Sequence, residues 1–294
     1  MADIGATVEI DEPLLRGWPL PRADGDADKE ERGATLVIAG SAEMPGAAAL
    51  AAISALRAGA GKIAVATVAA IAPGVALRLA EARVVAMAET EAGGIAADAM
   101  AKIEALLARV DAVLIGPGLQ DAPATRAFTR RVLKRATRVA VVVDALAMDA
   151  VLDLRHFERT PLLTPHAGEM AHLTGATKEA VSADPERHAR EAASRWNAVV
   201  ALKGATTYIA TPDGDCWRHV GSQPGLGTSG SGDVLAGIIV GLMARGAPLA
   251  QAAVWGIALH AHAGRALAER LGSIGYLARE LPAEIPILLD KLAH

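Results

Sequence analysis

Cysteine and aromatic residues are scarce in this sequence, and both shortages narrow the kind of protein it encodes. Cys216 is the only cysteine among 294 residues, so no disulfide forms within the chain, which is typical of a reducing compartment. Four Trp, two Tyr and two Phe stand against 67 alanines. A core built from so much alanine must be rich in closely packed helices. The chain is long enough to bury such a core, which excludes disorder as its global state, and we expect a cytoplasmic protein.

Strongly apolar runs and long basic runs are missing as well. The uncharged stretch 63–77 has 15 residues and contains Pro73 and Gly74, whereas a membrane-spanning helix needs roughly 18 or more apolar residues. The first 11 residues carry three acidic side chains and no basic segment, which argues against a signal peptide. The net charge is −4. We therefore expect neither a membrane nor a nucleic acid as partner.

Short apolar runs alternate with longer alanine-rich stretches along the chain. The short runs are apolar at consecutive positions, as in strands that are buried on both faces of a parallel sheet. This alternation predicts a layered α/β fold. A Pro-Asp-Gly turn at 212–214 predicts a β-hairpin between the last two strands. We expect strands at 35–39, 63–67, 112–115, 139–143, 162–163, 199–202, 208–210 and 216–220, and helices at 47–58, 98–108, 123–135, 185–196, 233–245, 249–270 and 283–292.

The chain divides into two parts of unequal length. Residues 1–33 are polar and rich in Gly and Pro, and the charged run 24–32 indicates an exposed N-terminal lead-in. After it we find no internal repeat, no low-complexity linker and no second class of composition. We therefore expect residues 34–294 to form one catalytic domain.

The strongest local signal is the glycine-rich segment 225–233, which runs into an apolar helix. Glycines let the backbone approach a ligand closely, and the first turn of the helix offers unpaired N–H groups and the positive end of its dipole. Together they favour an anion, most naturally a phosphate. Asp233 stands at the start of this helix and could act as a base toward a substrate hydroxyl. The alternative is that Asp233 only caps the helix.

Other segments follow predicted strands, at the edge where open α/β sheets bind ligands. Segment 203–207 (Lys-Gly-Ala-Thr-Thr) offers donors to phosphate oxygens. Segment 116–119 (Gly-Pro-Gly-Leu) and the small residues of 40–49 let main chain lie against a ligand. Each of these also fits an ordinary turn or plain helix packing.

For several single residues the sequence does not decide between a role in a site and a structural role. His166 could donate to a substrate, or it could be a structural residue at a turn, with Glu169 supporting the helix that follows. Asp144 ends a predicted strand, where a site role and a structural role carry equal weight. The remaining candidates do not make sites. His260 and His262 are two apart on a predicted helix and form a poor metal pair, Cys216 lacks a nucleophile motif, and the cluster Arg130, Arg131, Lys134 and Arg135 fits a solvated helix face.

Seven segments in a fixed order carry a resemblance to a known family. They are 45–48 (Pro-Gly-Ala-Ala), 58–61 (Ala-Gly-Ala-Gly), 116–119, 144–146 (Asp-Ala-Leu), 164–169 (Thr-Pro-His-Ala-Gly-Glu), 203–207 and 230–237 (Gly-Ser-Gly-Asp-Val-Leu-Ala-Gly). From about residue 34 to 292, the chain resembles the ribokinase-like superfamily and, within it, the ADP-dependent NAD(P)H-hydrate dehydratases. The last segment marks the superfamily, and 164–169 and 203–207 point to the dehydratases. The resemblance implies a three-layer α/β/α sandwich with a mostly parallel central sheet.

The resemblance also implies an activity and a set of contacts. The family consists of hydro-lyases that remove water from hydrated NADH and NADPH with help from ADP or, in some members, ATP. The implied contacts to the hydrated coenzyme are Ala47, Gly118, His166 and Asp233, and those to the adenine nucleotide are Lys203, Gly204, Ala205, Thr206, Thr207 and Gly232. The resulting hypothesis makes Asp233 the base that meets the ring hydroxyl, while phosphate transfer or phosphate-assisted departure makes that hydroxyl a better leaving group.

Two other functions compete with this one. A small-molecule kinase of the same superfamily, such as a hydroxyethylthiazole-type kinase, would use the same loop and the same aspartate, and segment 164–169 argues against it. A nucleotide-binding sensor without turnover is the other alternative, and the intact Gly232 and Asp233 argue against that.

The sequence departs from the family pattern at three places. Ala167 stands where the family has proline and Gln120 where it has glycine, which affects loop stiffness, while Gly-Thr-Ser at 227–229 leaves the choice between ADP and ATP open. The sequence shows no cluster of carboxylates that could hold Mg²⁺, so we expect any Mg²⁺ to be bound by the nucleotide phosphates.

We expect a homo-oligomer, and a separate chain that supplies the epimerase interconverting the two hydrates.

Overall fold

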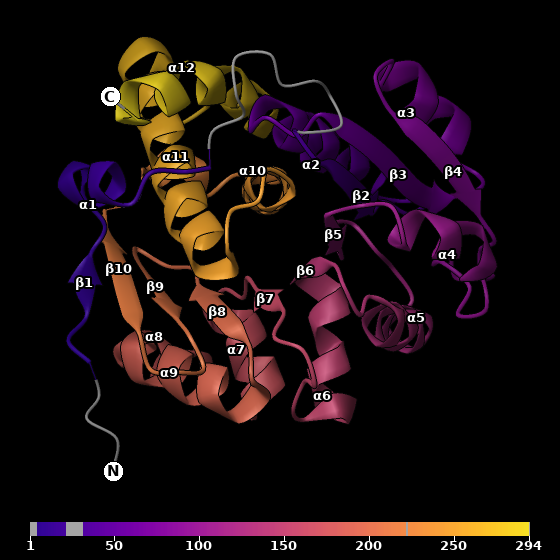
Figure 1. Cartoon of the computed structure of the whole chain (residues 1–294), viewed down its shortest axis with the longest axis horizontal. Coiled ribbons are helices and arrows are strands. Elements are labelled where there is room, and N and C mark those ends of the chain that lie inside the picture. The colour runs from indigo at the N-terminus through magenta and orange to yellow at the C-terminus, as the bar shows by residue number, and fades with distance from the viewer. Residues whose placement is uncertain (1–4, 22–31, 222, 294) are drawn as a thin grey trace.

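A computed structural model describes residues 5–21, 32–221 and 223–293, and ten strands of this part form one sheet (Figure 1). The neighbouring strands run parallel except at β8–β9 and β9–β10. The expected mostly parallel α/β fold is confirmed. In spatial order the strands are β1 (Val8–Glu9), β10 (Cys216–Val220), β9 (Thr206–Ala210), β8 (Val199–Leu202), β7 (Leu162–Leu163), β6 (Ala140–Val143), β5 (Ala112–Ile115), β2 (Ala34–Ile38), β3 (Lys62–Val68) and β4 (Arg83–Met87).

Helices cover both faces of the sheet (Figure 1), and each face buries its own apolar cluster. One face carries α1 (Glu12–Gly17), α2 (Pro45–Arg57), α3 (Ala72–Arg78), α10 (Ser231–Ala244), α11 (Leu249–Leu271) and α12 (Leu281–Ala293). The other carries α4 (Ala101–Leu107), α5 (Ala122–Arg135), α6 (Ala150–Leu154), α7 (Ala167–Thr174), α8 (Lys178–Ala183) and α9 (Pro185–Trp196).

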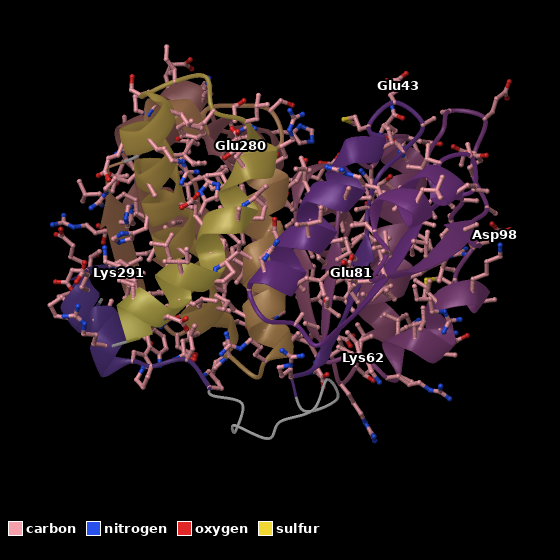
Figure 2. All side chains as sticks on the ribbon, turned by 90° about the horizontal axis from the view of Figure 1, so that it is seen from above. Glu43, Lys62, Glu81, Asp98, Glu280 and Lys291 are labelled. Carbon is pink, nitrogen blue, oxygen red and sulfur yellow. The ribbon has the colours of Figure 1, made fainter. Side chains whose placement is uncertain are left out.

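The parallel arrangement gathers the carboxyl ends of the strands at one end of the domain. Glu43, which follows β2, and Lys62, which begins β3, lie at opposite ends of the molecule in Figure 2. The segments that follow β2, β5, β6, β7 and β8 therefore meet at a single edge. This is the edge at which the sequence places its candidate ligand contacts.

Most predicted elements are confirmed, with shifts of a few residues at their ends. The hairpin is confirmed by the antiparallel pairing of β9 with β10. Strands β1 and β4, which lie at the two edges of the sheet, and the short helices α1, α3, α6 and α8 were not predicted, whereas α7 is the helix expected after His166. Strand β4 lacks the fully buried apolar pattern of the central strands, because only Met87 in it is buried. Short helices have too few turns to show a clear periodicity.

Helices α2 and α10 approach each other closely because α10 presents glycines to the backbone of α2. A Cβ on Gly237 would clash with the carbonyl oxygen of Ala51, and one on Gly241 would clash with that of Ala55. Both alanines are fully buried. This contact explains part of the high alanine content and fixes the position of α10, whose first turn belongs to the site described below.

We expect Gly237→Ala to destabilise the fold by about 1–3 kcal/mol, because the added methyl group must push α10 away from α2. Urea unfolding would measure the loss. Gly74→Ala is the matched control: it lies within α3, a Cβ there meets nothing within 4 Å, and alanine should leave stability unchanged or raise it by roughly 0.5–1 kcal/mol. Equal midpoints for the two variants would contradict the close-packing argument.

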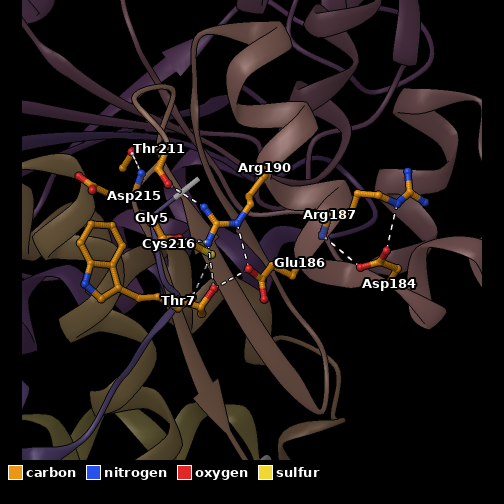
Figure 3. A network of polar contacts seen from close by, with 11 residues as sticks. Gly5, Thr7, Asp184, Glu186, Arg187, Arg190, Thr211, Asp215 and Cys216 are labelled. Atoms are coloured by element: carbon orange, nitrogen blue, oxygen red, sulfur yellow. Dashed lines mark hydrogen bonds and ion pairs between the residues drawn. The ribbon is translucent and has the colours of Figure 1, made fainter. Parts of the chain in front are cut away.

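Residues 5–21, the described part of the N-terminal segment, are mostly exposed, but a few side chains hold them against the domain. Leu15 is buried, and the ring of Trp18 stacks on that of Trp217 with centroids 5.5 Å apart. Figure 3 shows Arg190 of α9 donating to the carbonyl oxygen of Gly5 and to Thr7 Oγ1. Residues 24–31 of the charged run lie outside the described residues, and the division at residue 33 stays a prediction.

No helix within the described residues is long and apolar enough to cross a membrane. The stretch 246–264 also lacks charged side chains and is longer than 63–77. It forms most of α11, and its side chains pack almost entirely into the interior beside α10.

Candidate active site

The glycine-rich segment ends in the first turn of α10. Gly230 is the N-cap residue, with a φ of +88° and no side-chain cap, so its left-handed backbone requires glycine. The helix begins at Ser231, two residues before the predicted start. Val234 N–H donates to the carbonyl oxygen of Gly230, while the N–H groups of Gly232 and Asp233 have no acceptor among the described residues. The first turn therefore offers free donors to an anion.

Asp233 is the third residue of α10 rather than its cap, so the alternative that it only caps the helix is wrong. The pKa of its carboxyl group is raised to about 6: burial contributes most, the negative charge of Asp144 adds to it, and the Lys203 ammonium opposes both. A carboxylate with a pKa near neutrality both accepts and returns a proton under ordinary conditions. This favours the role of a base.

Lys203 forms an ion pair with Asp144 and also interacts electrostatically with Asp233. It follows β8, and its Nζ lies 3.4 Å from Asp144 Oδ1, which also accepts a 2.6 Å hydrogen bond from Thr164 Oγ1. Burial lowers the pKa of the Lys203 ammonium, but the charges of Asp144, Glu169 and Asp233 outweigh burial and the pKa is raised. Lys203 is therefore a fixed cation, and Asp144 holds it in place. Asp144 therefore has a structural role, because it orients Lys203, and through the same contact it belongs to the site.

His166 caps α7, as its structural reading proposed. Its Nδ1 accepts from the N–H groups of Gly168 and Glu169 at 3.0 and 3.1 Å, and Glu169 Oε2 accepts from the N–H of His166 at 2.8 Å. Because Nδ1 is the acceptor, the neutral ring carries its proton on Nε2. Nε2 lies 3.6 Å from Glu169 Oε2, and the side chain is 59% exposed, so a ligand could also reach Nε2. The structural and the ligand-binding roles are compatible.

Ala47 and Gly118 lie against each other at the same edge of the sheet. A Cβ on Gly118 would lie 2.6 Å from the Cβ of Ala47, and the φ of Gly118 is +64°. Two positions earlier, a Cβ on Gly116 would clash with the backbone of Asp144. The Gly-Pro-Gly-Leu segment thus leads from α2 to the Asp144–Lys203 pair.

A cavity of about 460 Å³ opens beside the first turn of α10. Of the residues chosen from the sequence, it brings together His166, Lys203, Gly204, Thr207 and Gly232. Ala205 and Thr206 belong to the same loop but do not line this cavity. Ala47, Gly118 and Asp233 also lie outside its lining, although Asp233 directly follows Gly232. The edge therefore offers this cavity, with Ala47, Gly118 and Asp233 placed outside its lining at the same edge.

Part of the cavity wall comes from segments chosen from the sequence, because Leu226, Gly227, Thr228, Ser231 and Leu235 lie within 225–237. The lining residues outside every chosen segment come from β10 and the chain that follows it and from α11: His219, Gly221, Gln223, Pro224, Ile257, His260 and Ala261. Those on α11 lie on one face of a long helix whose spacing indicates only core packing. No local sequence signal distinguishes them.

The described residues contain no group of three or more His, Cys, Asp or Glu side chains arranged to hold a metal ion. Arg130 pairs with Asp153 and Arg135 with Glu104, as expected for a solvated helix face. A larger cavity, about 1090 Å³, lies at the amino edge of β6, where Arg138 and Arg159 contribute to its lining. It contains none of the residues singled out as ligand contacts.

The arrangement is that of the ribokinase-like proteins. A ribokinase-like superfamily protein from Enterococcus faecalis has the same fold, with a TM-score of 0.82 over 98% of this chain and 96% of that one, at 24% identity. The family model for NAD(P)H-hydrate dehydratase matches residues 35–287. The chain belongs to the NAD(P)H-hydrate dehydratase family.

Individual relatives agree with this assignment. An ADP-dependent (S)-NAD(P)H-hydrate dehydratase from Xanthomonas campestris is 47% identical over 95% of this chain and 94% of its own length. The ADP/ATP-dependent NAD(P)H-hydrate dehydratase from Bacillus subtilis, co-crystallised with ATP and Mg²⁺, superposes with a TM-score of 0.84 at 28% identity, over 97% of this chain and 99% of that chain. A bifunctional NAD(P)H-hydrate repair enzyme from Moorella thermoacetica is 39% identical over 99% of this chain, which spans 58% of that protein.

Proposed function

We propose that the edge around the first turn of α10 is where this chain, an ADP-dependent (S)-NAD(P)H-hydrate dehydratase, removes water from the hydrated coenzyme. The activity follows from membership of the family and from 47% identity to a dehydratase along nearly the whole chain. The observation that supports the location is the Asp233 carboxylate, with its pKa of about 6, beside free helix N–H groups and the buried Lys203.

The cavity suits the adenine nucleotide. Lys203 and Gly232 are neighbours in its wall, since a Cβ on Gly232 would lie 3.6 Å from Lys203 Nζ. A phosphate placed there meets a fixed cation and the free N–H groups together. Leu226 and Ile257 add apolar wall for the base. Lys203, Gly204, Ala205, Thr206, Thr207 and Gly232 thus remain the proposed nucleotide contacts, with Ala205 and Thr206 acting through the backbone of their loop.

The surface beside Asp233 suits the hydrated nicotinamide ring. Ala47 and Gly118 contribute only small side chains there, next to Met44, so a flat ring could lie against them. His166 offers its Nε2 proton from the other side. Ala47, Gly118, His166 and Asp233 thus remain the proposed contacts of the hydrated coenzyme.

In this arrangement Asp233 takes the proton of the ring hydroxyl, and Lys203 with the first-turn N–H groups stabilises the negative charge that collects beside it. The bound nucleotide would supply its terminal phosphoryl group: the ring oxygen would bond to the phosphorus as the shortened nucleotide leaves, and the ring C–O bond would then break to release phosphate. Asp144 keeps Lys203 oriented and does not contact the ligand. The chain's own residues thus provide a base, a cation and an anion-binding turn within one small volume.

The test is an assay with NADPH hydrate and ADP, followed through the absorbance of the reduced nicotinamide. We expect the absorbance to return only when ADP is present. Phosphorylation of a small alcohol without recovery of absorbance would favour the kinase alternative. Binding of both ligands without any product would favour the sensor.

The pH dependence of turnover follows from the pKa of Asp233. Its pKa is raised from 3.8 to about 6, so the base is protonated and inactive below pH 6. We expect kcat/KM to fall tenfold per pH unit on the acid side and to reach a plateau above pH 7, as for one required ionised group. A rate that stays flat from pH 7 down to pH 5 would contradict this role.

Finer properties remain proposals. ADP is the expected nucleotide, with ATP as the alternative, and Mg²⁺ would enter on the phosphates because the described residues contain no metal cage. A homo-oligomer, a cytoplasmic location and a separate epimerase stay predictions. Comparing rates with ADP and ATP, with and without a chelator, would decide the first two.

A further inference from the structure

A buried hydrogen bond links the first turn of α10 to α11. Ser231 Oγ lies 3.0 Å from His260 Nε2, and the two residues are 4% and 9% exposed. Both line the cavity proposed for the nucleotide. The mechanism above uses neither of them, and the sequence analysis considered His260 only as a poor metal ligand.

The position of Ser231 gives this bond its importance. Its neighbours in the first turn, Gly230 and Gly232, have no side chains that could pack against the rest of the protein. Within segment 230–232, Ser231 is therefore the residue whose side chain can anchor the turn to another helix, and it does so through His260 on α11. The direction of the free N–H groups of Gly232 and Asp233 depends on how firmly this turn is held.

We propose that His260 is a positioning residue of the anion site: through Ser231 it holds the first turn of α10 in the orientation that binds the nucleotide phosphate. This inference rests on the proposed function, because it assigns that phosphate to the turn. His260 acts through Ser231 and does not react with the substrate.

The environment keeps His260 neutral. The pKa of its imidazole is lowered to about 4: burial contributes most, the facing charges of Lys203 and His219 lower it as well, and the contact with Ser231 opposes them. A neutral ring both donates and accepts, so the bond to the hydroxyl persists in either direction. His260 therefore contributes a hydrogen bond and no charge, and its contribution should not vary between pH 6 and 9.

A double-mutant cycle on the full chain tests the proposal, with ADP binding measured by calorimetry. His260→Phe and Ser231→Ala should each weaken ADP binding by about ten- to a hundredfold, the range for a lost buried hydrogen bond. The double variant should bind no more weakly than the weaker of the two single variants, because both remove the same bond. His260→Gln retains a donor and an acceptor and should bind ADP within about threefold of the parent.

The outcomes separate the proposal from its alternatives. Additive losses in the cycle, or a His260→Gln variant as weak as His260→Phe, would mean that His260 only fills space between the helices and would overturn the proposal. If His260→Phe fails to fold, the Ser231→Ala and His260→Gln pair still decides: loss in the first without loss in the second supports the proposal, and any other pattern overturns it. A parent chain that binds no ADP would instead defeat the proposed function and this inference with it.

Discussion

Asp233→Asn should abolish most turnover while leaving the fold intact. Removing the base is expected to lower kcat by roughly 100- to 10,000-fold, the range for general base catalysis. The amide has nearly the same shape as the carboxylate, so binding of ADP should change little. Steady-state rates with NADPH hydrate and ADP measure the effect, and turnover within a few-fold of the parent would refute the assignment of Asp233 as base.

The same substitution should stabilise the protein at neutral pH. The folded-state pKa of Asp233 lies above its unfolded value, so ionisation in the folded state has a cost that is absent below pH 4 and complete above pH 6. The asparagine variant avoids it, which corresponds to a gain on the order of 2–3 kcal/mol near pH 8. Asp213→Asn, at the exposed tip of the β9–β10 hairpin, is the matched control and should show no gain.

Urea unfolding of both variants and the parent at pH 4 and pH 8 would test this second effect. We expect the Asp233→Asn gain at pH 8 to disappear at pH 4. A gain that is equal at the two pH values would mean that ionisation of Asp233 has no cost in the folded state. That result would remove the basis for its raised pKa.

Lys203→Met should affect both halves of the site. It removes the cation that faces Gly232 and leaves Asp144 buried without its ion pair. We expect ADP binding to weaken by about a hundredfold or more, in line with a lost buried contact to phosphate. Because Lys203 lowers the pKa of Asp233, its loss should also move the acid limb of the rate profile above pH 6.

Lys102→Met provides the comparison, since Lys102 is an exposed lysine away from the site whose Nζ donates to the carbonyl oxygen of Ala86. It should leave ADP affinity and the acid limb unchanged. An acid limb that stays at the same pH in Lys203→Met would show that Lys203 and Asp233 are not electrostatically coupled. Unchanged ADP affinity would show that the phosphate binds elsewhere.

The sequence predicts the centre of the fold better than its edges. Strands β5, β7, β8 and β10 have the predicted boundaries, because burial on both faces leaves an uninterrupted apolar run in the central ones. Strand β4 escapes detection since its side chains are half-exposed at the sheet edge. The pairing of β1 with β10 depends on contacts more than 200 residues apart, such as Glu9 with Arg218, and no local pattern records it.

The sequence likewise predicts some residues of the site and leaves others undetected. Glycine-rich turns after strands identify Lys203, Gly118 and the start of α10, because these positions need small residues or a free donor where a strand ends. The sequence leaves the role of Asp233 open between cap and base, since only the backbone shows that Gly230 is the cap. His260 escaped attention because its partner, Ser231, lies 29 residues away and only the packing of α10 on α11 brings them together.

A crystal structure of the full chain with ADP and an unreactive analogue of the hydrated coenzyme would test the central claim most directly. We expect the ADP phosphate between Lys203 and the N–H groups of Gly232 and Asp233, and the nicotinamide ring beside Asp233. Density for either ligand in the larger cavity near Arg138 and Arg159, with the first turn of α10 left empty, would contradict it.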